Sequence, residues 1–162
     1  MDMARNEKRG FSLLELMAVV AVIAILATLA MPSLQGKIVR DQIVEAMPLA
    51  NIAKAPVATA WALTKTLPAD NAEAGLPVAD KIVNNFVSSV VVENGAIHLT
   101  FGNRANGAIK GKVITLRPAV IEDSPIVPVT WVCGHAAAPD KMTIHGVDKT
   151  TVDARYLPLN CR

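Results

Sequence analysis

The sequence predicts an α+β fold, in which a long N-terminal helix packs on a four-stranded antiparallel sheet and the chain ends in a C-terminal disulfide loop. Residues 11–31 form an apolar run that only three polar side chains interrupt. Apolar residues then recur at helical spacing over residues 43–64, and an alternating pattern typical of strands begins at residue 86. At 162 residues, the chain has room for one modest globular domain after this helix.

The apolar run predicts a membrane-spanning first half of the helix, because about 20 mostly apolar residues suffice to cross a bilayer. Its three polar residues are Ser12, Glu15 and Thr28. A carboxylate in a spanning helix costs about 2.5–3.5 kcal/mol even on a lenient insertion scale. We therefore expect Glu15 to have a function and a positively charged partner.

A short basic leader precedes the apolar run and contains Arg5, Lys8 and Arg9. Positive charge on one flank of a spanning segment keeps that flank cytoplasmic, which predicts that the rest of the chain is periplasmic or extracellular. A secretory signal has its cleavage site after the apolar core. In this chain the candidate cleavage site, after Gly10, comes before the core.

The second half of the helix is expected to be amphipathic, with one apolar face against the sheet. That face consists of Ile43, Ala46, Met47, Ala50, Ala53, Val57, Ala60, Trp61 and Thr64. Trp61 is accordingly assigned to the core. Proline removes a helical hydrogen bond and favours kinks. We therefore predict a kink at Pro32, whereas Pro48 and Pro56 leave the continuity of this half of the helix open.

The helix is expected to stop at residues 67–71, and a connecting loop with one helical turn at 78–83 follows. The first strand pair is predicted at 86–93 and 96–101, because Asn94-Gly95 favours a tight hairpin turn.

Within the second strand, alternation places His98 toward solvent. Two further strands are expected at 112–118 and 127–133. Period two directs Val127, Val129, Trp131 and Cys133 toward the helix.

The two cysteines, Cys133 and Cys161, lie on the side of the membrane that the leader assigns to the outside. In an oxidising compartment such a pair is most simply a disulfide, worth about 3–4 kcal/mol in the chain-entropy model. A metal site is the alternative. Two lone cysteines with His135 and His145 lack the usual zinc spacing, so the sequence favours the disulfide.

The motif GFSLLE at residues 10–15, with its basic leader, apolar helix and Pro32, resembles the prepilin signal of type IV pilins of the type IVa-like, short-leader kind. The resemblance implies that a prepilin peptidase cleaves between Gly10 and Phe11 and that Phe11 is then N-methylated. It divides the chain into a leader at 1–10, a transmembrane and fibre-core helix at 11–34, and an amphipathic helix with a globular pilin domain at 35–162.

In such fibres the apolar helices form a central bundle. The resemblance implies that Glu15 pairs there with the Phe11 amine of a neighbouring subunit, and that Pro32 marks a site of helix loosening. It implies a single-pass inner-membrane precursor that the pilus assembly machinery polymerises into an extracellular homopolymer. The fibre would serve adhesion, twitching motility and DNA uptake, and its surface loop would contact DNA or a host surface.

Two other functions stay open at this point: a minor pilin acting as a DNA receptor, and a pseudopilin of a type II secretion system. The formal net charge of +2 indicates no strong electrostatic partner. The cations of the disulfide loop are nearly balanced by its aspartates, which favours a solvated loop over a DNA-binding surface. Those cations are Lys141, His145, Lys149 and Arg155. The C-terminal cysteine pair favours a true pilin over a pseudopilin.

No catalytic constellation, cofactor motif or metal motif stands out in the sequence. Residues 107–113 resemble a phosphate-binding loop, but they have one residue too few between the glycines and Val113 where Ser or Thr should bind magnesium. We expect a loop between strands there. The chain is expected to be a substrate of enzymes rather than an enzyme, and to need no cofactor.

Overall fold

The structure is a computed structural model that describes residues 10–162, with the side chains of residues 30–33 excepted. The predicted leader cations Arg5, Lys8 and Arg9 lie outside the described residues. The chain divides into two compact units, an N-terminal unit, Met1–Lys37, and a C-terminal unit, Ile38–Arg162.

The helices follow one another from residue 13 to residue 64. Helix α1 is Leu13–Ala46, the 3-10 turn η1 is Met47–Ala50, and helix α2 is Asn51–Thr64. Pro48 lies in η1, where a tighter turn accommodates its missing N–H. Pro56 lies inside α2. The chain therefore stays helical past both prolines, with a 3-10 turn at the first.

Helix α2 ends at a left-handed residue. Lys65 has a φ of 55° and donates its backbone N–H to the Trp61 carbonyl at 2.9 Å, which closes the last turn. After a loop, the short 3-10 helix η2 is Ala79–Lys81. This turn lies inside the predicted segment 78–83.

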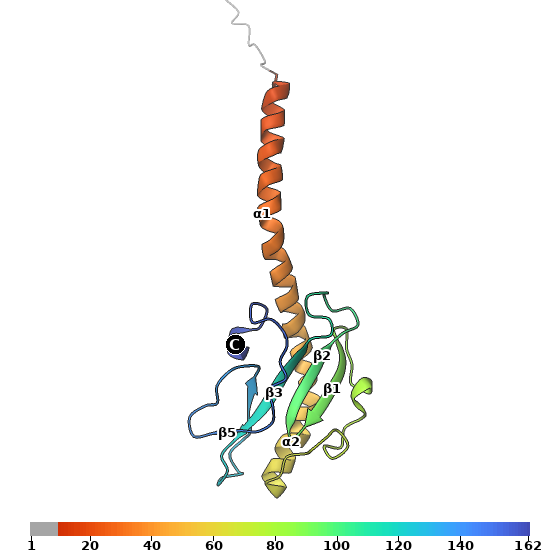
Figure 1. Cartoon of the computed structure of the whole chain (residues 1–162), viewed down its shortest axis with the longest axis vertical. Helices are drawn as coiled ribbons and strands as arrows, with labels where there is room; N and C mark the ends of the chain where they lie inside the picture. The colour runs from red at the N-terminus through yellow and green to blue at the C-terminus, as the bar shows by residue number, and fades with distance from the viewer. Residues whose placement is uncertain (1–9) are drawn as a thin grey trace, which may run out of the picture. The chain divides into compact units, whose positions relative to one another are not determined.

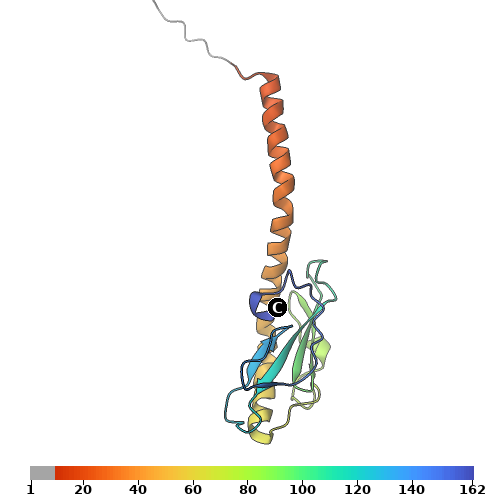
Figure 2. The same ribbon diagram turned by 60° about the vertical axis from the view of Figure 1, so that its left-hand side comes forward.

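A five-stranded antiparallel sheet follows. Its strands are β1 (Val87–Glu93), β2 (Ala96–Phe101), β3 (Val113–Val120), β4 (Thr130–Cys133) and β5 (Thr143–Ile144). The order is β1-β2-β3-β4, and β5 pairs with the end of β3. The Asn94-Gly95 turn joins β1 and β2 with φ angles of 49° and 81°, as a tight hairpin requires. In the C-terminal unit the sheet lies along α2 (Figures 1 and 2).

The core lies between the helices and the sheet. Ile43, Ala50, Ala53 and Val57 are fully buried on the helix side. Trp61 is also buried, which confirms its predicted core position. On the sheet side the buried residues include Val90, Val92, Ile97, Leu99, Ile114 and Leu116. Thr64 was predicted on the buried face but is exposed, because α2 ends there beyond the sheet.

The end of the sheet differs from the sequence prediction in two strands. Strand β4 starts at Thr130 instead of 127, because Pro128 has no N–H for a strand ladder. Strand β3 continues past Pro118 to Val120, where β5, which was not predicted, pairs with it. The predicted direction of Trp131 is right: Lys54 of α2 lies 5.9 Å from its ring centroid.

His98 was predicted to face solvent, but its residue is only 5% exposed. The prediction fails because both faces of β2 are covered. One face packs on the helices, and a segment of the C-terminal loop crosses the other, with the Lys149 N–H donating to Thr115 Oγ1 at 3.1 Å. Gly146 in the same segment lies so close to Ala96 that an added Cβ would be 2.5 Å from the Ala96 Cβ.

The free edge of β1 is occupied by one side chain. Asn71 donates from Nδ2 to the Val90 carbonyl at 2.9 Å and accepts the Val92 N–H on Oδ1 at 2.5 Å. A side-chain amide offers a donor and an acceptor like those of a neighbouring strand. Asn71 therefore blocks part of an edge that otherwise invites pairing with another chain.

Candidate functional sites at the N-terminal junction and the disulfide loop

The predicted cleavage junction lies just before α1. Gly10 is exposed, and an added Cβ there would meet no atom within 4 Å. Phe11 is 82% exposed. Ser12 caps the helix, because its Oγ accepts the Leu14 N–H at 3.3 Å and its carbonyl accepts the Leu16 N–H at 3.1 Å. The peptide bond between Gly10 and Phe11 is thus outside the helix and open to an enzyme.

Glu15 lies in the first turn of α1 and is exposed. The positive end of the helix dipole favours a carboxylate at this position. Within residues 10–162, Glu15 takes part in no ion pair. The arrangement leaves its carboxylate available to a positive group outside the chain.

The helix around Glu15 is apolar on all sides. Within the described residues one helix is long and apolar enough to cross a membrane, and its most apolar window is unburied. Large exposed side chains there include Leu14, Leu16 and Val20. Small residues open a shallow apolar groove on it, lined by Leu16, Met17, Val20, Ala21 and Ala24. Such a surface suits lipid or the same helix of other copies.

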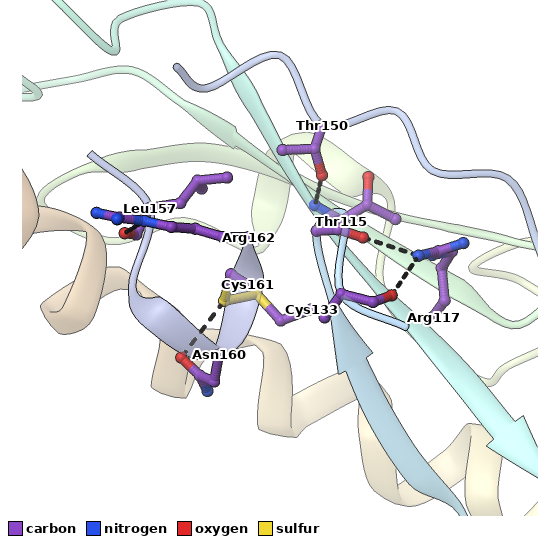
Figure 3. The surroundings of a disulfide bond; sticks show 10 residues. Thr115, Arg117, Cys133, Thr150, Leu157, Asn160, Cys161 and Arg162 are labelled. Carbon is purple, nitrogen blue, oxygen red and sulfur yellow. Dashed lines mark hydrogen bonds between the residues drawn. A yellow bond between two sulfur atoms is a disulfide. The ribbon is translucent and has the colours of Figure 1, made fainter. Parts of the chain in front are cut away.

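Cys133 and Cys161 form a disulfide, as predicted, with their Cα atoms 4.5 Å apart. Cys133 ends β4, and Cys161 ends the 3-10 helix η3, Leu159–Cys161. Both are buried, and Figure 3 shows the bond joining η3 to the end of β4. Both sulfurs are consumed by this bond, so the alternative of a cysteine metal site is excluded. Within the described part of the chain, no group of three or more His, Cys, Asp or Glu residues could hold a metal.

Arginine side chains hold the backbone on either side of the disulfide. Arg117 of β3 donates from Nη2 to the carbonyls of Gly134 and Ala136 at 2.8 and 3.3 Å. Arg162 donates from Nε to the Leu157 carbonyl at 3.1 Å, as Figure 3 shows. Gly134 has a φ of 55°, and an added Cβ would lie 2.4 Å from the Cys161 carbonyl oxygen. The turn after β4 therefore requires glycine.

Most of the predicted loop cations are paired with acids. Lys149 pairs with Glu93, and Arg155 with Asp153 at 2.8 Å. His145 Nε2 lies 2.9 Å from Glu122 Oε1. Lys141, the fourth of these cations, takes part in none of the ion pairs among the described residues.

These pairs also affect the acids. The hydrogen bond from Lys149 lowers the pKa of Glu93, and the backbone and side-chain bonds from Arg155 lower that of Asp153. Burial would raise the pKa of Asp148, but hydrogen bonds from Thr150 and His135 outweigh it and lower that pKa. His135 Nδ1 lies 2.7 Å from Asp148 Oδ2. The basic side chains of the loop thus mostly lie beside acids, and its described residues show no cluster of unpaired positive charge.

Sequence reasoning missed two structural elements of this region. One is the support that Arg117 gives to the turn after β4. The sequence signal for it was a single cation in an otherwise uncharged strand. The other is the buried bond between His98 and Thr115, at 2.9 Å. Residues 107–112 lie in the loop between β2 and β3, as predicted, and residue 113 is the first residue of β3.

Comparison with known proteins gives a match to a family model at each end of the chain. Residues 39–162 match the family model for pilin, a bacterial filament protein, and residues 5–31 match the prokaryotic N-terminal methylation motif. The chain is 32% identical over 164 residues to a fimbrial protein of Neisseria meningitidis serogroup B, covering 96% of this chain and 94% of that one.

Two further relatives align over similar lengths. The type IV major pilin protein PilE of Neisseria gonorrhoeae is 33% identical over 161 residues, with 96% of this chain and 94% of the relative covered. The fimbrial protein EcpC of Eikenella corrodens is 35% identical over 164 residues, with 99% and 94% covered.

Proposed function

Because this chain belongs to the pilin family of bacterial filament proteins, we propose that it is made as a membrane-anchored precursor and assembled after cleavage at Gly10. The chain is a structural subunit of a type IV pilus. Cleavage, methylation and charge pairing are supported by the exposed junction, by the capped helix that follows it, and by the carboxylate of Glu15, which is in no ion pair within residues 10–162.

The precursor has three parts in this proposal. Residues 1–10 are a leader that stays cytoplasmic because of its basic residues. Residues 11–34 anchor the chain in the inner membrane once, and residues 35–162 lie on the far side. A prepilin peptidase removes the leader, Phe11 is methylated, and inner-membrane assembly machinery moves the subunit into an extracellular fibre. The chain is the substrate in these reactions and catalyses none of them.

Glu15 couples cleavage to assembly. Cutting after Gly10 creates a positive amine on Phe11, and the carboxylate of Glu15 on a neighbouring subunit is its partner in the helix bundle. Two charges that enter an apolar environment together offset each other's desolvation. A subunit that lacks one of them strands the other at a cost of several kcal/mol. Pro32 permits local loosening of the helix as subunits pack.

The first test is the intact mass and N terminus of the dominant polypeptide in fibres sheared from the native cells. We expect a species that starts at methylated Phe11 and carries the disulfide. A dominant polypeptide that still carries residues 1–10 would contradict the proposal. Processed chain that stays in the membrane and is scarce in fibres would instead favour a minor pilin or a pseudopilin.

Two variants separate cleavage from assembly. Gly10→Ser is expected to block cleavage, whereas Gly107→Ser, at another glycine with open space around it, leaves cleavage intact. Glu15→Ala is expected to be cleaved but to disappear from fibres. Glu45→Ala removes an exposed carboxylate from the same helix and serves as the matched control. Fibre yields from Glu15→Ala equal to those of the wild type would rule out the pairing.

A further inference from the structure

The turn between β2 and β3, residues 102–112, carries concentrated positive charge. It contains Arg104, Lys110 and Lys112 and no acidic residue. The sequence around it is equally one-sided, since no Asp or Glu occurs between Glu93 and Glu122. We call residues 102–112 the basic turn.

All three cations of the basic turn are exposed, and none takes part in an ion pair among residues 10–162. Lys149 and Arg155 of the disulfide loop, by contrast, are paired with Glu93 and Asp153. The basic turn thus gathers three cations outside the ion pairs found among residues 10–162, whereas Lys141 is the one such cation among the four of the disulfide loop. A set of like charges held together attracts an anionic surface.

The basic turn has a fixed shape. Ile109 anchors it with a fully buried side chain. Backbone hydrogen bonds close it from Lys110 N–H to the Asn106 carbonyl at 3.0 Å and from Gly111 N–H to the Phe101 carbonyl at 2.8 Å. Gly111 takes a φ of 75°. The backbone that carries the three cations thus needs little further ordering to meet a ligand, which favours binding.

The basic turn contacts the segment of α1 that leaves the apolar run. Its Asn106 N–H donates to Gln42 Oε1 at 2.8 Å. Gln42 lies eleven residues after Met31, where the apolar run ends. Eleven residues of chain span at most about 40 Å, so the basic turn is tethered within reach of the membrane surface. Residues 37–45 of α1 carry two cations and two acids in total. Because these charges cancel, this segment does not neutralise the basic turn.

We propose that the basic turn binds anionic phospholipid headgroups of the leaflet from which the C-terminal unit emerges. This inference rests on the proposed membrane anchoring of residues 11–34. Each Lys or Arg near an anionic bilayer is attracted to it, and tethering makes the encounter intramolecular. Three cations are few for nucleic acid, whose binding proteins usually neutralise more phosphates. The contact would hold an unassembled subunit against the membrane and would be lost when the subunit enters the fibre.

The test uses the full chain inserted into lipid nanodiscs. One set contains phosphatidylcholine alone, and the other contains phosphatidylcholine mixed with phosphatidylglycerol. The measurement is the rate at which an amine-reactive reagent modifies each lysine, read by peptide mass spectrometry. We expect Lys110 and Lys112 to react more slowly in anionic discs, on the order of tenfold, and high salt to abolish the difference. Lys65 and Lys81, which are also exposed, should react equally in both.

Two variants test the role of the turn itself. Arg104→Gln should weaken the protection of Lys110 and Lys112 in anionic discs, whereas Lys65→Gln, which removes the same charge elsewhere, should not. Equal rates for Lys110 and Lys112 in both lipids, or the same slowing at Lys65, would overturn the inference while leaving the proposed function intact. Protection by duplex DNA in discs of phosphatidylcholine alone, with none by phosphatidylglycerol, would also overturn it. A chain that fails to insert into the discs would overturn the membrane anchoring and this inference together.

Discussion

Thr115 Oγ1 and His98 Nδ1 lie 2.9 Å apart on neighbouring strands, in a layer that the C-terminal loop covers. Thr115 Oγ1 also accepts the Lys149 N–H from that loop. We assign the neutral imidazole with its proton on Nε2, because Nε2 faces Glu93 Oε2 at 3.8 Å and Nδ1 is then free to accept. A chain of hydrogen bonds therefore ties the disulfide loop to β3 and β2.

This arrangement predicts that acid weakens the fold. Burial lowers the pKa of His98 from its ordinary 6.5, and the nearby Lys149 ammonium lowers it further, against the opposite effects of Glu93 and Asp148. As the pH falls below about 6.5, His98 becomes protonated in the unfolded chain but stays neutral in the folded chain, which stabilises the unfolded chain. We expect the urea midpoint of the full chain in detergent, followed by tryptophan fluorescence, to fall between pH 7 and pH 5.

Replacing the histidine tests this assignment. His98→Asn should be less stable at pH 7 but should show a flatter pH dependence over this range, while Asn51→Ala, which changes no ionisable group, should keep the wild-type slope. Equal slopes for His98→Asn and the wild type would refute the role of His98. The lowered pKa values of Glu93 and Asp148 act separately, because their contribution is lost only below their ordinary values of 4.5 and 3.8.

Asn71→Ala is expected to destabilise the C-terminal unit by about 1–3 kcal/mol, because it leaves backbone groups of Val90 and Val92 without partners. Urea unfolding measures the loss. Asn51→Ala removes an exposed asparagine at the start of α2 and should be nearly neutral. An Asn71→Ala midpoint equal to that of the wild type would mean that the edge of β1 needs no support from this side chain.

Gly134→Ala should disturb the disulfide region. The alanine would have to adopt a φ of 55° with its Cβ 2.4 Å from the Cys161 carbonyl oxygen. Such backbone strain costs on the order of 1–3 kcal/mol. We expect slower oxidation of the two cysteines, measured by thiol labelling during refolding, and a lower urea midpoint. Gly107→Ala, with open space at its Cβ, is the control, and equal behaviour of the two variants would contradict the steric account.

Removing the disulfide should cost stability without removing the fold. The bridge closes a loop with a sequence separation of 28, which corresponds to about 3–4 kcal/mol in the chain-entropy model. The double variant Cys133→Ser/Cys161→Ser should lose about this amount in urea unfolding. Hydrogen exchange should rise first around η3 and the Gly134 turn and stay slow in β1 and β2. Uniformly faster exchange would show that the whole sheet depends on the bridge.

The local patterns predicted most of this fold. Alternation and the Asn94-Gly95 turn located β1 and β2 to within a residue, because hairpin pairing is determined by neighbouring residues. The positions of β4 and β5 depend on which parts of the later loops reach β3. A short stretch of sequence does not contain that information. For the same reason, alternation within β2 predicted a solvent-facing His98. The loop segment around Lys149, far along the sequence, covers that face.

Some features of the candidate sites could likewise be predicted from the sequence, and others required the tertiary structure. The cysteine pairing followed from there being only two cysteines on an oxidising side. The roles of Gly10, Phe11, Glu15 and Pro32 in processing and assembly came from motif resemblance, and they stay predictions. The partner expected for Glu15 belongs to another copy of the chain. The cations of the disulfide loop could be counted from the sequence, but their pairing with Glu93 and Glu122 required the tertiary structure.

The amide of Asn71 also bears on what kind of polymer this chain can form. Cross-β fibrils grow when unpaired strand edges of identical chains stack without limit. Here a side chain of the same subunit occupies the Val90 carbonyl and the Val92 N–H, so these two groups at the edge of β1 are closed to pairing with another copy. At this part of the β1 edge, one asparagine thus disfavours the unlimited strand pairing of an amyloid-like state.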